Sequence, residues 1–315
     1  MTTRLKVRIG AIAWCVFAYL TVPGLNHANW PPALIMLSAL VLAPLAWCLA
    51  RDDRDAGMIL RLRQTGMVLQ LPGALLLCAA FVLPAGPRAM ACTLVWTLAL
   101  ASMALVGVMR IGRRGPRPVA DLVRDAGLVY ALVGGAWLLA DRAGLQLLGF
   151  DPVMVIVAAG HFHFAGLVLP IVGGTALARR PTSRLGQVAA WGVIFGVPLV
   201  AAGYAATHFG WDQRFETTAM WLLVASGFAL AVLHLQLAAS ERTAPRASRV
   251  FWALAGVMLA GGMVLAGLYA SRGLSQPMPW LDLPGMRTLH GTLNPVGFSL
   301  AALLGWCRAG RCCQG

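Results

Sequence analysis

The sequence predicts an all-α fold: a polytopic transmembrane helical bundle of about ten spans, in a single domain covering residues 1–315. Hydrophobic residues make up 59% of the chain and charged residues only 11%, whereas a soluble protein carries about 25% charged residues. Apolar runs long enough to cross a bilayer recur from one end of the chain to the other. No charged stretch between them is long enough for a soluble domain, so we expect the lipid bilayer to be the main partner of this protein.

Ten apolar runs justify this span count, since a helix needs about 20 apolar residues to cross a bilayer. The first run follows a basic start, as a secretory signal does, but the next segment, PGLNHANW, offers no A-x-A cleavage site. We therefore expect a helix there as well. The ten predicted spans cover residues 9–25, 32–50, 66–84, 89–109, 126–141, 153–178, 186–206, 217–239, 250–270 and 286–306.

The basic residues predict the orientation, because cytoplasmic loops carry an excess of lysine and arginine. With the N-terminus in the cytoplasm, the inner segments hold 20 of the 25 basic residues and the outer segments hold 5. We therefore expect both termini inside, an N-in/C-in arrangement, and no binding of nucleic acid despite the net charge of +14. The basic residues are 24 arginines and one lysine, a bias typical of GC-rich bacterial genomes, so we expect the inner membrane of a bacterial cell. The five outer basic residues are Arg88, Arg142, Arg214, Arg272 and Arg287.

Several kinds of active site are excluded by what the sequence lacks. Lys6 is the single lysine, so no buried lysine can form a Schiff base and there is no G-K-[ST] phosphate loop. There is no H-E-x-x-H, no G-x-S-x-G and no G-x-G-x-x-G. The seven cysteines form no C-x-x-C pair, and we expect them to be reduced; Cys307, Cys312 and Cys313 cluster near the C-terminus. Whether the protein is an enzyme stays open.

Histidines are the ionisable side chains that lie well inside the predicted spans, where such groups are costly and are functional by default. His161 and His163 lie in the sixth span and His290 in the tenth. At ~1.5 Å per residue, His161 lies ~12 Å and His290 ~8 Å below the outer surface. These three histidines therefore share the outer half of the membrane. His234 falls near the cytoplasmic end of the eighth span, and we expect it at the interface.

The spacing of His161 and His163 predicts opposite directions for their side chains, since residues i and i+2 do not share a helix face. Either the helix is distorted here, which the nearby glycines and Pro170 permit, or the two histidines have different roles. His163 shares a face with Gly166 and Gly173, and small residues mark close helix contacts. We therefore expect His163, rather than His161, to point into the bundle.

His290 and Asn294 form a second polar pair, spaced i and i+4, with Gly297 on the same face. An asparagine one turn from an imidazole can hold it in one tautomer, as neighbours of metal-bound histidines do. A buried polar group without a partner costs a few kcal/mol. We therefore expect His163 and His290 to lie close together, with Asn294 beside them, in a pocket open toward the outer surface.

One outer segment offers another candidate. His208, Asp212 and Glu216 are spaced i, i+4 and i+8, one face if the segment is helical, and histidine with carboxylates suits a divalent metal. A solvated helix start explains the same residues. His27, in NHANW, is expected at the surface.

The segments HFHFAGLVLPIVGG and LHGTLNPVGFSLAALLGW resemble the two most recognisable segments of the YndJ-like bacterial membrane proteins. Phe164 stands where that family has tyrosine, and Pro295 where it has alanine. Glu216 lies where an acidic residue of the family is expected. The family is transporter-like and largely uncharacterised, so the resemblance implies a multi-helix membrane fold and marks His161, His163, His290 and Asn294, without supplying an activity.

Three functions fit these residues. The first is a metal or haem site, with His161, His163 and His290 as metal ligands and His163, His290 and Asn294 around the cofactor. The second is a transporter, in which the same cluster lines the path of a small polar solute. The third is a structural or assembly protein, in which the histidines bond helices to one another at ~0.6–2 kcal/mol each. The sequence does not identify a ligand, and all three functions stay open.

Overall fold

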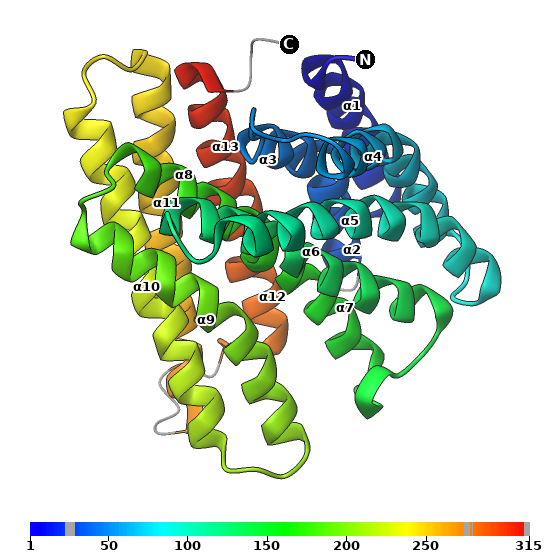
Figure 1. Cartoon of the computed structure of the whole chain (residues 1–315). Coiled ribbons are helices and arrows are strands. Elements are labelled where there is room, and N and C mark those ends of the chain that lie inside the picture. The colour runs from blue at the N-terminus through cyan, green and yellow to red at the C-terminus, as the bar shows by residue number, and fades with distance from the viewer. Residues whose placement is uncertain (23–28, 274–277, 279, 312–315) are drawn as a thin grey trace.

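The computed structural model describes residues 1–22, 29–273, 278 and 280–311, and these fold into helices with no strand among them (Figure 1). His27, Cys312 and Cys313 lie outside the described residues. In chain order the helical elements are α1 (Thr3–Thr21), α2 (Trp30–Leu37), η2 (Ser38–Leu42), α3 (Ala43–Leu49), α4 (Met58–Val82), α5 (Pro87–Arg114), α6 (Val119–Ala143), η3 (Leu147–Gly149), α7 (Pro152–His161), η4 (Phe162–Val168), α8 (Leu169–Arg179), α9 (Arg184–His208), α10 (Gln213–Ser240), α11 (Arg246–Ala270), η5 (Ser271–Gly273), α12 (Leu283–Thr292), η6 (Leu293–Ser299), α13 (Leu300–Trp306) and η7 (Cys307–Arg311).

The predicted all-α, multi-pass fold is confirmed. Within the described residues, eight helical runs are long and apolar enough to cross a membrane. α1 and the run α12–η6–α13 are helical where the sequence predicts spans, but they are not among these eight. Both begin with polar residues: α1 carries Arg4, Lys6 and Arg8, and α12 carries Arg287 and His290. The total of ten spans and the orientation therefore stay predictions. The expectation that no lysine is buried is wrong, since Lys6 is 6% exposed and its ammonium donates to the Met67 carbonyl.

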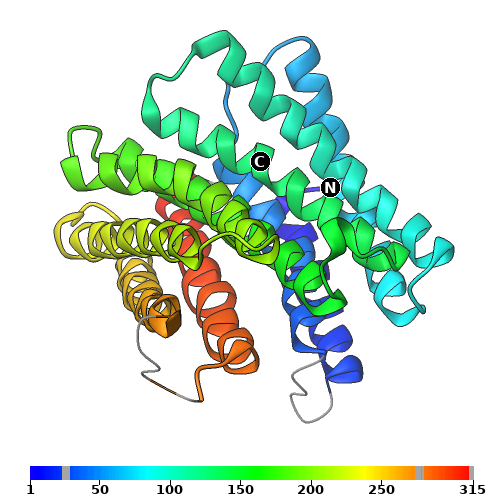
Figure 2. The same ribbon diagram turned by 90° about the horizontal axis from the view of Figure 1, so that it is seen from below.

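Two groups of long helices flank the centre of the bundle. α4, α5 and α6 pack against one another in chain order, and so do α9, α10 and α11 (Figures 1 and 2). α13 packs on α11, and α12 contacts both α11 and α2, so the end of the chain closes the space between the second group and the start of the chain. In Figure 1 the start of α1 and the end of α13 lie at the same end of the bundle, as an arrangement with both termini on one side requires.

Three interrupted helical runs form the centre: α2–η2–α3, α7–η4–α8 and α12–η6–α13. They contact one another through η2 and η4, η4 and η6, and α2 with α7 and α12. The apolar windows of the first two are 89% and 67% buried, against 39% for α4. The most enclosed part of the molecule is thus built from its least regular helices.

Each interruption is a π-helical segment, where the backbone hydrogen bond spans five residues instead of four. The Ala43 N–H bonds to the Ser38 carbonyl and the Leu169 N–H to the Phe164 carbonyl. The residue that follows each donor is a proline, Pro44 or Pro170, which has no N–H to continue the α-helical pattern. The distortion that the sequence permits around His161 and His163 is therefore present.

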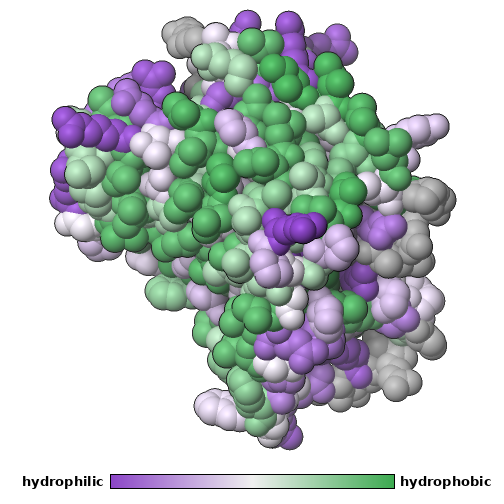
Figure 3. Space-filling view, turned by 90° about the vertical axis from the view of Figure 1, so that its right-hand side faces the viewer, coloured by the Kyte–Doolittle hydropathy of each residue, from purple (hydrophilic) through white to green (hydrophobic). Residues whose placement is uncertain are grey.

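The outer surface is apolar. Leucine and valine side chains on α4 and α5 are widely exposed, among them Val68 at 70% and Val82 at 71%. Figure 3 shows one such face: hydrophobic residues cover most of its upper half, and hydrophilic residues gather at its upper and left edges and over its lower part. In water this exposure would be costly, whereas in a bilayer it is expected. The protein is therefore a multi-pass membrane protein.

His234 is buried within the protein, whereas the sequence marks only its position near the cytoplasmic end of a span. Its side chain is fully buried between α10 and the end of the chain. Nδ1 donates to the Leu230 carbonyl at 2.9 Å, and the Trp306 indole donates to Nε2 at 3.4 Å. The position of His234 along its helix could be predicted from the sequence. The packing of α13 against the face of α10 that carries His234 could not.

A network of charges lies where α5 and α6 meet the α3–α4 loop. Arg110 is 4% exposed and pairs with Asp55 at 2.6 Å and with Asp125 at 3.2 Å. Arg114 pairs with Asp52 at 2.8 Å and also contacts Asp125. The network ties three segments together at the end of the bundle that the sequence predicts to be cytoplasmic. The sequence spacing is consistent with this network. Arg110 and Arg114 are spaced i, i+4 before a short turn, and Asp121 and Asp125 are spaced i, i+4 after it.

Candidate functional site

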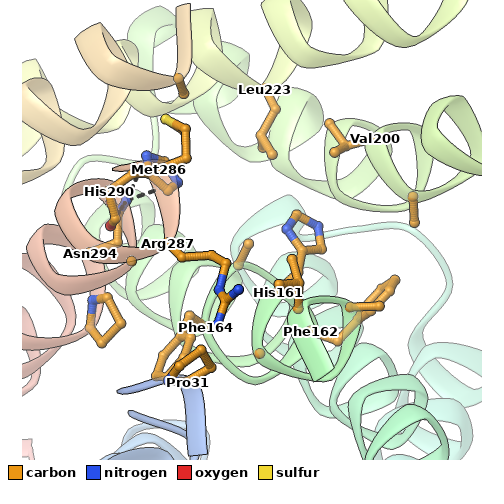
Figure 4. A pocket seen from close by; sticks show the side chains of 18 of the residues that line it. Pro31, His161, Phe162, Phe164, Val200, Leu223, Met286, Arg287, His290 and Asn294 are labelled. Carbon is orange, nitrogen blue, oxygen red and sulfur yellow. Dashed lines mark hydrogen bonds between the residues drawn. The ribbon is translucent and has the colours of Figure 1, made fainter. Parts of the chain in front are cut away.

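A cavity of about 300 Å³ lies among α2, α7–η4, α9, α10, α11 and α12–η6 (Figure 4). This volume is within the range of ligand pockets, ~300–1,000 Å³. Most of its wall is aliphatic, aromatic or thioether. The polar side chains of the described wall are His161, Tyr204, Tyr269, Arg287, His290, Asn294 and Ser299. The cavity thus contains three of the four residues singled out from the sequence.

His290 and Asn294 are hydrogen-bonded, as their spacing predicts. The Asn294 amide lies 3.1 Å from Nε2 of His290 and donates to the His290 carbonyl at 3.0 Å. Nδ1 of His290 donates to the Gly262 carbonyl at 2.9 Å, since a carbonyl oxygen only accepts. Both ring nitrogens of His290 therefore have a hydrogen-bond partner within the protein.

Gly262 allows this pair to sit against α11. A Cβ atom at Gly262 would lie 2.7 Å from Oδ1 of Asn294, closer than real side chains approach. The small residue therefore brings the polar face of α12–η6 into contact with the backbone of α11.

His161 occupies another wall of the same cavity (Figure 4). Its Nε2 lies 3.4 Å from the Val197 carbonyl, a long hydrogen bond. The ring meets Phe162 edge-on, with 5.3 Å between centroids. His161 is less tightly held than His290, and it is the imidazole that the cavity exposes from the sixth predicted span.

His163 lies outside the cavity wall. It is fully buried, and Nδ1 donates to the Ala159 carbonyl at 2.8 Å. The Trp96 indole donates to Nε2 at 3.1 Å, and the two rings stack. A Cβ atom on Gly134 would lie 2.8 Å from the imidazole, so α6 packs directly on this ring.

The inward position predicted for His163 is therefore confirmed. The prediction that His163 shares a pocket with His290 and Asn294 is corrected. The cavity brings His161, not His163, together with His290 and Asn294. The physical reason is the π-helical segment and the i, i+2 spacing, which send the two imidazoles to different sides of η4. The described residues contain no group of three or more histidine, cysteine, aspartate or glutamate side chains placed to hold a metal, so His161, His163 and His290 do not form one ligand set.

His208, Asp212 and Glu216 also do not share a face. α9 ends at His208, whose ring stacks on Phe150 with centroids 4.2 Å apart. Asp212 caps the start of α10 by accepting from the Arg214 N–H at 2.8 Å. The helix break between them separates the three residues that a continuous helix would have aligned.

Glu216 instead supports the cavity wall. It is 1% exposed and forms an ion pair with Arg272. The Arg272 guanidinium stacks on Tyr269, 4.2 Å from the ring centroid, and lies 5.9 Å from that of Tyr204. Both tyrosines line the cavity. A buried acid and its partner thus hold two wall residues in place from behind.

Arg287 is the site residue that sequence reasoning missed, because it was counted among the charges of the outer segments. The structure places it in α12, one turn before His290, on the cavity wall. Figure 4 shows its side chain extending from α12 toward Phe164 and His161. The signal was its spacing, i−3 from His290 and i−7 from Asn294, which puts all three on one face.

Comparison with known proteins identifies the family of this membrane protein. Residues 33–298 match the family described as YndJ-like protein. The chain is also similar to the uncharacterized membrane protein YndJ of Bacillus subtilis (strain 168), with 26% identity over 215 residues. That alignment covers 68% of this chain and 37% of the Bacillus protein, so the chain spans well under two thirds of its relative's length. No solved structure matches the chain. Since the family match extends over most of the chain and includes His161, His163, His290 and Asn294, this protein belongs to the YndJ-like family.

Proposed function

We propose that this protein binds a small, largely apolar ligand in the cavity formed by α7–η4, α9–α11 and α12–η6. The observation that supports this most directly is the cavity itself: ligand sites are concave, mostly apolar, and carry a few convergent polar groups. Here those groups include His161 on one wall and His290 with Asn294 on another. In this proposal His161, His290 and Asn294 orient the polar part of the ligand, and His163 stabilises the fold behind it.

A metal ion or a haem is the second candidate, because two imidazoles border one cavity. For His290 to coordinate, Nε2 must give up the hydrogen bond from Asn294 or Nδ1 the bond to Gly262. The imidazole of His161 is held by one long hydrogen bond, at 3.4 Å, and is therefore easier to free than that of His290. An absorption spectrum and metal analysis of the purified protein test this candidate; a haem band or stoichiometric metal that disappears in both His161→Ala and His290→Ala would favour it over an apolar ligand.

Transport of a small solute would use the same cavity, but it requires access from both ends of the bundle. Tyr204, Met220, Tyr269 and Arg287 lie near the helix ends that the sequence predicts to be outside. The charged network of Arg110 and its partners lies at the other end and does not contribute to the described wall. The arrangement favours a binding site reached from one side, and carriage across the membrane would need a second conformation.

Two neighbouring alanines provide a matched test of binding. Ala201 lines the cavity, whereas Ala202 is exposed and is not part of the wall. Purified protein in a neutral detergent is titrated with radiolabelled dodecanol, an uncharged amphipath of suitable size. We expect saturable binding near one molecule per chain in the wild type and in Ala202→Phe, and a loss of about tenfold or more in affinity in Ala201→Phe, because the added ring fills the cavity. Equal binding by the two variants would place the ligand elsewhere.

A further inference from the structure

We propose that the ligand is an acidic amphipath, with one carboxylate or phosphate group on an apolar body, and that Arg287 binds the anionic group. This inference rests on the proposed function, since it names the chemistry of the molecule in the same cavity. It adds a recognition residue that was not part of the histidine site.

The charge of the cavity wall carries the inference. Arg287 borders the cavity, and the described wall residues include no aspartate, glutamate or lysine. The segments outside the described residues, 23–28, 274–277, 279 and 312–315, contain no aspartate or glutamate either. Arginine keeps its proton in proteins. The wall therefore has a positive charge next to an apolar space, and the complementary ligand is an anion.

The position of Arg287 suits a single headgroup. Figure 4 shows the guanidinium between the wall that carries His290 and Asn294 and the wall that carries His161 and Phe164. A guanidinium offers its N–H groups in a planar fork that matches two oxygens of a carboxylate or phosphate. His161 and Asn294 line the same cavity and offer neutral hydrogen-bonding groups for the headgroup.

The rest of the wall suits the apolar body. Met220, Leu223, Val224, Leu259 and Met263, from α10 and α11, line the cavity. These side chains give no hydrogen bonds, and methionine adapts its shape to flexible chains. In a low-dielectric site a charge pair is also stronger than in water, so one cation among apolar residues discriminates sharply between an acid and its uncharged analogue.

Ligands that differ only in the headgroup test the proposal. The purified full chain, in a neutral detergent at neutral pH, is titrated with radiolabelled dodecanoate, dodecanol and dodecylammonium, which share one chain length. Hydrocinnamate represents a soluble acid, whereas dodecanoate represents an acid taken from the bilayer. The variants are Arg287→Gln and Arg287→Lys. The control is Arg214→Gln, since the Arg214 side chain is 90% exposed and lies at the same predicted end of the bundle.

We expect the wild type and Arg214→Gln to bind dodecanoate about tenfold or more tightly than dodecanol, as a charge-assisted pair predicts. Arg287→Gln should lose this preference but still bind dodecanol, which also shows that it is folded, and Arg287→Lys should keep part of it. Displacement of dodecanoate by hydrocinnamate would support a soluble acid, and binding of dodecanoate alone would support a lipid acid.

Equal binding of dodecanoate and dodecanol, tightest binding of dodecylammonium, or an acid preference that survives in Arg287→Gln would overturn the assignment while leaving the cavity as a binding site. If none of the probes binds the wild type, the proposed function fails together with the ligand class. The two failures are therefore distinguishable.

Discussion

The indole Nε1 of Trp96 lies 3.1 Å from Nε2 of His163, with both side chains fully buried. The imidazole Nδ1 bonds to the carbonyl four residues earlier, so each ring nitrogen has a protein partner. The same pattern recurs at His234, which bonds to its own i−4 carbonyl and accepts from Trp306. In both places a buried histidine joins two helices through hydrogen bonds at its two ring nitrogens.

His163 and His161 should therefore differ in their contributions to stability. His163→Ala leaves a cavity and an unpaired Trp96 donor, and we expect it to lower the free energy of unfolding by about 3 kcal/mol. His161→Ala removes a half-buried ring with one long hydrogen bond and should cost about 1 kcal/mol or less. Denaturant-induced unfolding of the purified variants measures both values. A larger loss in His161→Ala than in His163→Ala would reverse these roles.

Gly262 and Gly261 offer a similar comparison on α11. A Cβ at Gly262 would collide with Asn294, whereas nothing lies within 4 Å of one at Gly261. We expect Gly262→Ala to destabilise the protein by about 1–3 kcal/mol through overpacking and to weaken dodecanol binding by displacing Asn294. Gly261→Ala should be neutral or stabilising by up to about 1 kcal/mol, because alanine favours a helix. Thermal unfolding of both variants, with and without dodecanol, checks this; matching behaviour would mean that α12 does not depend on that close approach.

The positions of the helices could be predicted from the sequence because apolar runs and loop charges are properties of local composition. The span predicted at 66–84 corresponds to α4, Met58–Val82, which begins earlier because the helix also includes the basic residues before the apolar run. The burial of His163 followed from the small residues on its face. These features need no knowledge of which helices are neighbours.

The composition of the site could not be predicted in the same way. Depth along a helix placed His163 and His290 at similar levels, but a π-helical segment turned His163 toward Trp96 and left His161 in the cavity. Arg287 was counted among the charges of the outer segments, although α12 carries it along the cavity wall. Facing directions near a π-helical segment depend on long-range packing, which a single helical period does not describe.

The orientation is open to a direct test. If both termini are cytoplasmic, the α5–α6 loop after Arg113 and the segment before Asp282 must lie on opposite sides of the membrane, because an odd number of predicted spans separates them. Reporter fusions at Arg113 and at Asp282 should be active in the cytoplasm and in the outer compartment, respectively. Fusions that report the same compartment would show that one of the predicted spans between them does not cross the membrane.

Acid should weaken the charged network through Asp52, which lies in the loop between α3 and α4. Burial acts to raise the pKa of Asp52, but the hydrogen bonds and charges of Arg54 and Arg114 outweigh it, and the pKa is held below its usual value. A carboxylate whose pKa is lower in the folded state stabilises the fold above its unfolded pKa, ~3.9, and loses that contribution as the pH falls toward the folded pKa. We expect the melting temperature of the wild type to fall between pH 5 and pH 3, roughly the range in which the unfolded carboxyl begins to bind protons.

Asp52→Asn should melt lower than the wild type at pH 7 and should lose less on acidification, whereas Asp53→Asn, at a side chain that is 86% exposed, should follow the wild type. If Asp52→Asn and Asp53→Asn give parallel curves of melting temperature against pH, the acid sensitivity arises from other carboxylates of the network.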